Sequence, residues 1–317
     1  MNMEMSLNNK FIMLCGLPGS GKSTLAQSLI DDNTVWLSSD KIREEFYGSE
    51  DEQGEANVIF DEMKKRTIQA LKDGKNVIYD ACNINAKKRI ALLKELRKIS
   101  CIKKCIICAT PYENCIDRDL NRERVVKEYV IKRMYMSWNT PFFYEGWDEI
   151  EICFSDSSKR SKGKYCDFIS DHMNYNQDTP YHLETLGRHM QDVGDYLVNQ
   201  LAYETEDNIV LAGYIHDCGK PFTKSFKDSK GNPCDIAHYY QHQCTGAYDS
   251  LFFDYGDKTE TDILEISCLV GLHMNPFNWT ESKTQEKYRQ LWGEDLFSKV
   301  MHLHKADEKS SKKSKDL

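Results

Sequence analysis

A glycine-rich loop between an apolar run and a helical pattern is the feature that most narrows what this chain can fold into. The run "KFIMLCG" ends at Gly16, the loop "GLPGSGKS" spans residues 16–23, and "KSTLAQSLIDD" follows with helical spacing. In a loop of this pattern, backbone N–H groups wrap around phosphates, and the following helix adds its positive N-terminal end. Lys22 would reach the β and γ phosphates of a nucleotide and Ser23 would bind Mg²⁺. The residues expected to hold ATP in this loop are Gly16, Gly19, Ser20, Gly21, Lys22, Ser23 and Thr24.

Strand-type and helix-type segments alternate through the first half of the chain, which predicts an α/β domain with helices on both faces of a parallel sheet. Strands are expected at residues 10–16, 34–40, 75–83 and 104–110, and helices at residues 22–32, 55–73 and 86–99. Ligands of such sheets bind beyond the carboxyl ends of the strands. Asp40, Asp80 and the glycine loop all fall at that edge.

Two charged groups beyond the loop favour a kinase. In "SSDKIR", Asp40 could take the proton of an acceptor hydroxyl and Arg43 could hold an anionic acceptor. The alternative is that Asp40 caps a helix and Arg43 is solvated.

The segment "RDLNRERVVKEYVIKR", residues 118–133, is rich in arginine and lysine. It reads either as a solvated helical face or as a lid whose arginines stabilise the transferring phosphoryl group. We favour the lid, with Arg118 and Arg122 on ATP and Arg122 as the catalytic arginine. The other cations of the segment are Arg124, Lys127, Lys132 and Arg133.

In this order, "GLPGSGKST", "SSDKIR", "YDACNIN", the lid arginines and "VIKRMYMSW" resemble the kinase domain of polynucleotide 5′-hydroxyl kinases, over about residues 9–155. The resemblance implies that Asp40 is the general base on a 5′-OH and that Arg43 contacts a neighbouring acceptor phosphate. Asp80 and Asn83 are expected at the substrate. Kinases of sugars and other small alcohols share this core, so the acceptor stays open between the two classes.

The second half has a different composition. All nine histidines lie at or after His172, and nearly all of the net charge of −8 falls beyond residue 155. A transition-metal site usually contains imidazole, whereas nucleotide phosphates are handled by lysine, arginine and Mg²⁺. We expect a polar linker at residues 156–169, an all-α domain at 170–310 and a disordered tail at 311–317.

His216 and Asp217, in "YIHDCGK", are the centre of a second motif set. With other histidines and an aspartate in a definite order, they resemble the HD superfamily of metal-dependent phosphohydrolases. The resemblance implies a first metal ion held by His189, His216, Asp217 and Asp307. His242 and His273 would serve a second metal ion or the phosphate directly, and Lys220 would face the phosphate.

The identity of the metal stays open between Mn²⁺, Fe²⁺, Co²⁺, Ni²⁺ and Zn²⁺. His172, His302 and His304 read as ordinary structural histidines, while His182 and His238 are ambiguous. The pair in "CIKKCIIC" could suggest zinc, but buried thiols are the better interpretation.

Together the two halves predict a bifunctional enzyme that heals broken nucleic-acid ends. The kinase would phosphorylate a 5′-OH, and the metal-dependent phosphohydrolase would remove a 3′-phosphate or a 2′,3′-cyclic phosphate. RNA or DNA repair would then continue with a ligase acting downstream. The rivals are a small-metabolite kinase fused to a nucleotide phosphohydrolase, and a kinase regulated by a nucleotide-sensing HD domain.

Twelve cysteines without a disulfide framework, and the absence of signal-peptide and membrane-span patterns, predict a cytoplasmic protein. Homo-oligomerisation is left open.

Overall fold

The computed structural model describes residues 9–49, 54–122, 125–155, 158–279 and 281–311. The chain divides into two units, one of Met1–Met134 with Pro141–Asp156 and one of Tyr135–Thr140 with Ser157–Leu317. The predicted Arg124 and residues 312–317 of the predicted tail lie outside the described residues.

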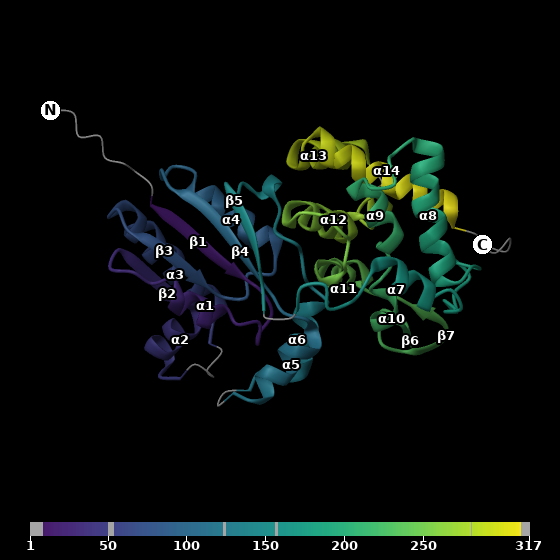
Figure 1. The fold of residues 1–317 in the computed structure, drawn as a ribbon. Coiled ribbons are helices and arrows are strands. Elements are labelled where there is room, and N and C mark those ends of the chain that lie inside the picture. Colours follow the sequence, from purple (N-terminus) through teal and green to yellow (C-terminus); the bar gives the residue numbers. More distant parts are fainter. Residues whose placement is uncertain (1–8, 50–53, 123–124, 156–157, 280, 312–317) are drawn as a thin grey trace. The chain divides into compact units, whose positions relative to one another are not determined.

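The first unit is built on a five-stranded parallel sheet with the strand order β2-β3-β1-β4-β5 (Figure 1). The strands are β1 (Lys10–Cys15), β2 (Thr34–Ser38), β3 (Asn76–Asp80), β4 (Ile102–Ala109) and β5 (Glu149–Phe154). The predicted parallel α/β sheet is therefore confirmed, although the sequence prediction missed β5. That strand alternates charged and apolar residues in "EIEICF", a weaker pattern than the apolar runs of the others.

Helices flank this sheet, as expected from the alternating pattern. They are α1 (Lys22–Ser28), α2 (Ser39–Tyr47), α3 (Ala56–Lys72), α4 (Ala86–Leu96), α5 (Tyr112–Leu120) and α6 (Glu128–Tyr135), with a 3-10 turn at Phe143–Glu145. Asp40 was expected at a strand end suited to a first helical turn, and it lies in the first turn of α2, directly after β2 stops at Ser38. Apolar side chains from β1, β3, β4 and α1 meet in a buried cluster of Leu14, Ala26, Ile78 and Ile106.

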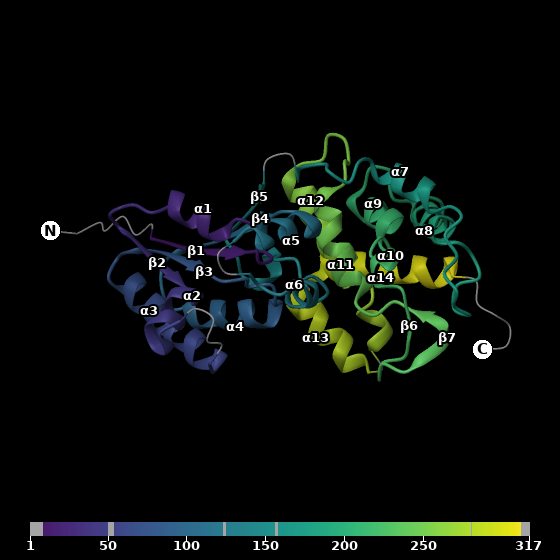
Figure 2. The same ribbon diagram turned by 90° about the horizontal axis from the view of Figure 1, so that it is seen from below.

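The second unit is mostly helical. Its helices are α7 (Tyr165–Asp171), α8 (Leu186–Leu201), α9 (Asn208–Ile215), α10 (Lys220–Thr223), α11 (His242–Asp249), α12 (Glu260–Leu272), α13 (Ser282–Trp292) and α14 (Glu294–Ser310), with 3-10 turns at Ser250–Phe252 and Pro276–Asn278. The predicted helical region is present, and the structure adds one short antiparallel hairpin of β6 (Ser225–Lys227) and β7 (Pro233–His238) to it (Figure 2). The three residues of β6 are too few to show a period in the sequence.

The predicted linker at residues 156–169 also needs a correction, since most of it belongs to the second unit. Residues from Tyr165 onward form α7, and Ile169 packs on Leu186 and Met190 of α8. The six residues Tyr135–Thr140 also belong to the second unit, where the Trp138 ring is fully buried against Tyr248. A continuous kinase domain over residues 9–155 is thus interrupted in the structure.

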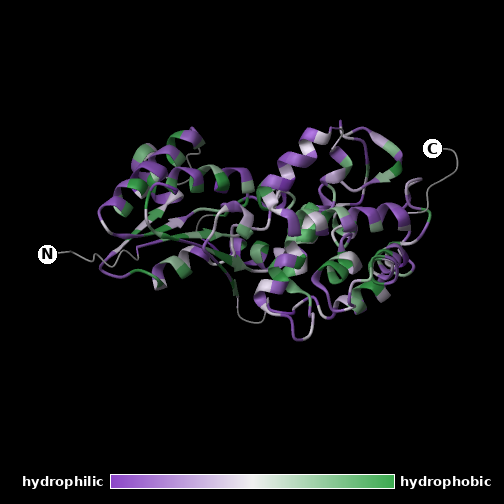
Figure 3. Ribbon diagram, turned by 90° about the horizontal axis from the view of Figure 1, so that it is seen from above, coloured by the Kyte–Doolittle hydropathy of each residue, from purple (hydrophilic) through white to green (hydrophobic). Residues whose placement is uncertain are grey.

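Hydropathy follows this architecture. Figure 3 shows mainly hydrophobic residues along the central sheet and banded hydrophobic and hydrophilic faces on the surrounding helices. Among the described residues, no helix combines the length and the apolar character that crossing a membrane requires.

Candidate active sites

The glycine loop has the backbone that its sequence demands. Gly19 and Gly21 have φ angles of 83° and 91°, in the left-handed region that favours glycine. A Cβ atom at Gly16 would lie 2.8 Å from the carbonyl oxygen of Cys108, and one at Gly19 would clash with the carbonyl of Cys115. The loop therefore packs too closely on its neighbours for any side chain at these two positions.

Lys22 is buried at the start of α1, and its Nζ donates to the Leu17 carbonyl of the same loop at 2.7 Å. Burial would lower the pKa of Lys22, but neighbouring thiols and Asp80 raise it, so that the ammonium stays charged. Ser20 is buried in the loop, while Ser23 and Thr24 are exposed in the first turn of α1. The Lys22 ammonium could therefore exchange its hydrogen bond to the Leu17 carbonyl for one to a phosphate oxygen.

Asp80 lies beside Ser23 at the carboxyl end of β3. Its Oδ2 accepts hydrogen bonds from Ser23 Oγ at 3.0 Å and from Trp36 Nε1 at 3.2 Å. Burial raises the pKa of Asp80, while the Lys22 charge and these hydrogen bonds oppose the rise. A serine hydroxyl and a carboxylate side by side fit the Mg²⁺ of a nucleotide complex. Asp80, which was predicted to contact the substrate, thus lies beside Ser23, the predicted Mg²⁺ ligand.

Asp40 and Arg43 form an ion pair on α2, with Arg43 Nη1 donating to Asp40 Oδ1 at 2.6 Å. The helix cap is Ser38, whose hydroxyl accepts from the Asp40 N–H, so the alternative that Asp40 is the cap does not describe this helix. The Asp40 carboxylate is about half exposed, at 46%, and can meet an incoming acceptor.

Asn83, also predicted at the substrate, has its side-chain amide directed inward. The amide donates to the carbonyls of Leu14 at 2.7 Å and Ala81 at 3.1 Å. The backbone carbonyl of Asn83 accepts from Arg89, whose guanidinium forms a buried bidentate pair with Glu145. Asn83 thus holds the loop after β3 beside β1.

The lid arginines differ in position. Arg118 Nη1 lies 3.4 Å from Thr110 Oγ1 and beside Gly21, so it is next to the glycine loop. Arg122 is nearly half exposed, with Nη1 3.8 Å from Asp119. Lys127, Lys132 and Arg133 are exposed at or near α6. Arg118 is therefore already at the phosphate loop.

The predicted metal ligands converge from five helices in the second unit. His189 lies in α8, His216 follows α9, His242 begins α11, His273 follows α12 and Asp307 lies in α14. These groups and Asp217 are all at most 5% exposed. They form two clusters of potential ligands whose atoms lie within 4.8 Å of one another. The clusters are His189 with His216 and Asp307, and Asp217 with His242 and His273.

Asp217 connects the two clusters. Its Oδ2 lies 3.4 Å from His189 Nε2 and 3.2 Å from His216 Nε2. Its Oδ1 lies 3.1 Å from His242 Nε2 and 3.9 Å from His273 Nε2. One carboxylate oxygen thus faces each pair of imidazoles.

The imidazoles are oriented by their outer nitrogens. The Nδ1 atoms of His216, His242 and His273 lie 2.8, 2.8 and 2.7 Å from backbone carbonyls. A carbonyl can only accept, so each Nδ1 carries the proton and each Nε2 presents a lone pair. The Nε2 atoms then face one another across 3.2 Å in the pairs His189–His216 and His242–His273. Ring nitrogens this close, in a buried site with two carboxylates, fit divalent metal ions.

Lys220 is buried beside the cluster. Its Nζ lies 2.6 Å from Asp217 Oδ2, donates to Gln177 at 2.8 Å and lies 3.3 Å from His182 Nε2. Sequence reasoning missed Gln177 and Glu184 and left His182 ambiguous. They lie on the irregular segment before α8, where no periodic pattern marks them.

The remaining histidines have ordinary partners. His172 stacks on Phe168, His302 bonds to Tyr203, and His304 packs on Phe277. His238 stacks on Tyr240, with 8° between the ring planes. Cys105 and Cys108 are buried, and the potential metal-ligand clusters among the described residues contain no cysteine.

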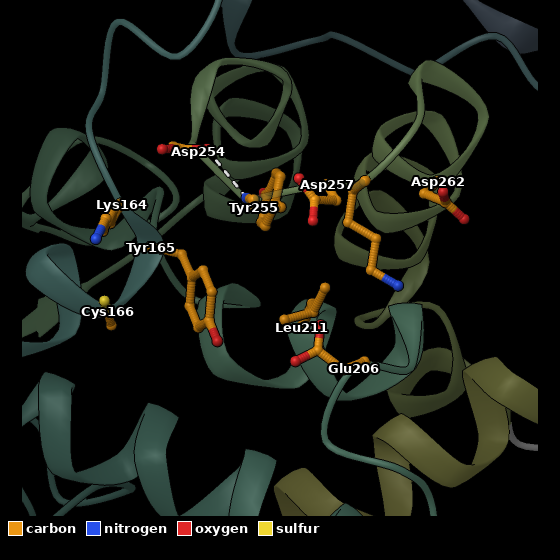
Figure 4. A pocket seen from close by; sticks show the side chains of 11 residues that line it. Lys164, Tyr165, Cys166, Glu206, Leu211, Asp254, Tyr255, Asp257 and Asp262 are labelled. Atoms are coloured by element: carbon orange, nitrogen blue, oxygen red, sulfur yellow. Dashed lines mark hydrogen bonds between the residues drawn. The ribbon is translucent and has the colours of Figure 1, made fainter.

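A separate hollow of about 510 Å³ opens in the second unit, between α7 and the segment before α12 (Figure 4). Its walls combine Tyr165 and Tyr255 with the carboxylates of Glu206, Asp257 and Asp262. It contains none of the predicted site residues.

Comparisons with known proteins agree with the first of these sites. Residues 11–141 match the family model described as an AAA domain. The chain is 28% identical over 155 residues to L-seryl-tRNA(Sec) kinase of Methanococcus maripaludis, covering 47% of this chain and 60% of that protein. It is 27% identical over 154 residues to transcription factor bHLH140 of Arabidopsis thaliana, covering 46% of this chain and 16% of that protein. The chain therefore spans less than two thirds of the length of either curated relative.

Among solved structures, 43% of this chain aligns with 45% of a chain in the structure of the Pnkp1/Rnl/Hen1 RNA repair complex, at 22% identity and a TM-score of 0.37. A likeness at this level carries no functional argument. The family match, the glycine loop and the parallel sheet together support a P-loop kinase domain, which implies ATP and Mg²⁺.

Proposed function

We propose that this chain is a bifunctional nucleic-acid end-healing enzyme, which phosphorylates a 5′-OH end and hydrolyses a 3′-phosphate or 2′,3′-cyclic phosphate. One observation carries the proposal: the chain that holds the P-loop also holds two buried clusters of potential metal ligands, and Asp217 of the second cluster also faces the imidazoles of the first. The first chemistry adds a phosphate to a nucleic-acid end and the second removes one. A broken strand with a 5′-OH and a 3′-phosphate needs both before a ligase can seal it.

At the kinase site, different residues would bind the phosphates, the Mg²⁺ ion and the acceptor. Lys22 and Arg118, which lie at the glycine loop, would neutralise charge on the transferring phosphoryl group, and Arg122 would join them when the lid closes. Ser23 and Asp80 would hold Mg²⁺. Asp40 would accept the proton of the acceptor hydroxyl, while Arg43, released from its pair with Asp40, would hold an acceptor phosphate.

At the phosphohydrolase site, His189, His216, Asp217 and Asp307 would hold one divalent ion, and His242 and His273 a second that Asp217 shares. Such ions lower the pKa of water towards about 7 and polarise a phosphoryl oxygen. The Nδ1 hydrogen bonds keep the imidazole lone pairs directed inward. Lys220 would place a positive charge beside the phosphoryl oxygens.

An RNA oligonucleotide with a 5′-OH and a 2′,3′-cyclic phosphate tests both activities at once. The full chain is incubated with ATP, Mg²⁺ and Mn²⁺, and both ends are read by mass spectrometry. We expect a gain of phosphate at the 5′ end and hydrolysis at the 3′ end. Lys22→Ala should abolish only the first change and Asp217→Asn only the second. If the wild-type protein leaves both ends unchanged while it binds ATP and metal ions, end healing is refuted. The alternative of a small-metabolite kinase fused to a nucleotide phosphohydrolase then takes its place.

A second acceptor deserves a direct comparison, because one relative is named as a kinase of L-seryl-tRNA(Sec). That acceptor is a hydroxyl on an aminoacyl group attached to RNA. Seryl-tRNA and the 5′-OH oligonucleotide should therefore compete for ATP in one reaction. Preferential labelling of the seryl group would replace 5′-end phosphorylation in the proposal.

Mutating Asp217 also separates hydrolysis from regulation. If the second unit is a hydrolase, the Asp217 variant loses 3′-end turnover while its kinase rate stays unchanged. A variant that changes the kinase rate instead would support a nucleotide-sensing role for the second unit.

A further inference from the structure

His189 is held differently from the other three histidines of the cluster. His216, His242 and His273 lie at helix ends, and each reaches the backbone carbonyl three residues earlier. His189 is the fourth residue of α8, where the neighbouring backbone carbonyls accept the hydrogen bonds of the helix. Its Nδ1 therefore needs a partner from outside the helix.

Glu184 is the carboxylate that faces this nitrogen, within ion-pair distance but outside hydrogen-bond geometry. Its Oε1 lies 3.1 Å from His189 Nδ1, and the side chain is only 4% exposed. The same oxygen lies 3.4 Å from Nδ1 of His182. One buried carboxylate thus faces the outer nitrogens of two imidazoles.

His182 extends the contact to Lys220. Its Nε2 lies 3.3 Å from Lys220 Nζ, which lies 2.6 Å from Asp217 Oδ2. With Nδ1 protonated towards Glu184, Nε2 can accept from the ammonium. A second member of the segment, Gln177, accepts from Lys220 and donates to the Glu184 carbonyl at 3.2 Å. The segment before α8 therefore contacts both a metal ligand and the cation beside it.

We propose that Glu184 is a positioning residue of the phosphohydrolase site, which turns Nε2 of His189 towards the metal and, through His182, fixes Lys220 beside Asp217. The inference rests on the proposed metal-dependent function. Carboxylates behind a ligating histidine fix its tautomer and its ring orientation, and their loss typically costs about 10–100-fold in metal affinity.

Zinc is the probe for the first test, because it is diamagnetic and its affinity can be measured by competition with a chelator. Glu184→Gln keeps the size of the side chain but removes its charge, and Glu184→Ala removes the acceptor altogether. We expect zinc affinity to fall about 10–100-fold in Glu184→Ala and less in Glu184→Gln. Asp192→Asn is the control, since this carboxylate on α8 pairs with Arg188 and contacts no metal ligand.

Long-range ¹H–¹⁵N spectra of the zinc-loaded protein separate positioning from mere folding. The wild-type protein should show His189 protonated at Nδ1, and Glu184→Gln should show a weakened or mixed tautomer while the signals of His216 stay unchanged. An unchanged His189 tautomer together with unchanged zinc affinity in Glu184→Gln overturns the inference. Failure of the wild-type protein to bind zinc overturns the proposed function instead, so the two failures are distinguishable.

His182→Phe tests the connection to Lys220. We expect its zinc affinity to match that of the wild-type protein, while inorganic phosphate binds the zinc-loaded variant several-fold more weakly. Equal phosphate affinity in the two proteins would refute the role of His182.

Discussion

Loading the histidine cluster with divalent ions should stabilise the second unit strongly. The ligands come from five helices spread between His189 and Asp307, so they form a site only when this unit is folded. An ion that binds only the folded state, at a hundredfold excess over its Kd, adds about 2.7 kcal/mol to the free energy of unfolding. Two such ions add about 5 kcal/mol. For a unit of this size each kcal/mol raises the Tm by about 2–4 °C, so the expected shift is on the order of 10 °C or more.

Differential scanning calorimetry of the protein, first with a chelator and then with Mn²⁺ or Zn²⁺, measures this shift. Asp217→Asn should lose most of it, because Asp217 faces both pairs of imidazoles. His172→Gln is the matched control, since His172 stacks on Phe168 away from the cluster. A wild-type shift no larger than that of Asp217→Asn would refute the reasoning, and so would an equal response to Mg²⁺, which prefers oxygen ligands.

Three further measurements address other parts of the molecule. Asp80→Asn keeps a side-chain oxygen to which Ser23 and Trp36 can donate, so the Tm should not change. The kinase kcat should fall about 10–100-fold. An unchanged kcat would show that Asp80 is not part of the Mg²⁺ site. Burial lowers the pKa of His189, but Asp307 and Glu184 raise it to about 9. At pH 7.5 zinc must therefore displace about one proton from His189, and the affinity of the protein for zinc should rise with pH up to about pH 9. Calorimetry in buffers of different ionisation enthalpy would count that proton, and a count of zero would contradict the raised pKa. Arg89→Met leaves the Glu145 carboxylate buried without its cation and should cost about 3–5 kcal/mol in urea unfolding, whereas a loss below about 1 kcal/mol would show that the pair is not needed.

The local patterns of the chain predicted much of the first unit. The glycine loop can take its backbone conformation only with glycine at specific positions, and it needs a strand before it and a helix after it. Both are present, as β1 and α1. Strand β5 was missed because its residues alternate in character. Sequence order also cannot reveal that β3 pairs with β1. That pairing is what brings Asp80 to Ser23.

In the second unit, the sequence by itself determined the residue types of the proposed metal site and their order, from His189 to Asp307. The tertiary structure brings them together, because ligands separated by more than a hundred residues can meet only when five helices pack. It also decided the role of Glu184, which no periodic pattern marks and which contacts His189 because α8 leaves that imidazole without a backbone partner. Residue types and short spacings in the sequence determine which chemical groups are available, whereas the direction of each side chain depends on which elements pack around it.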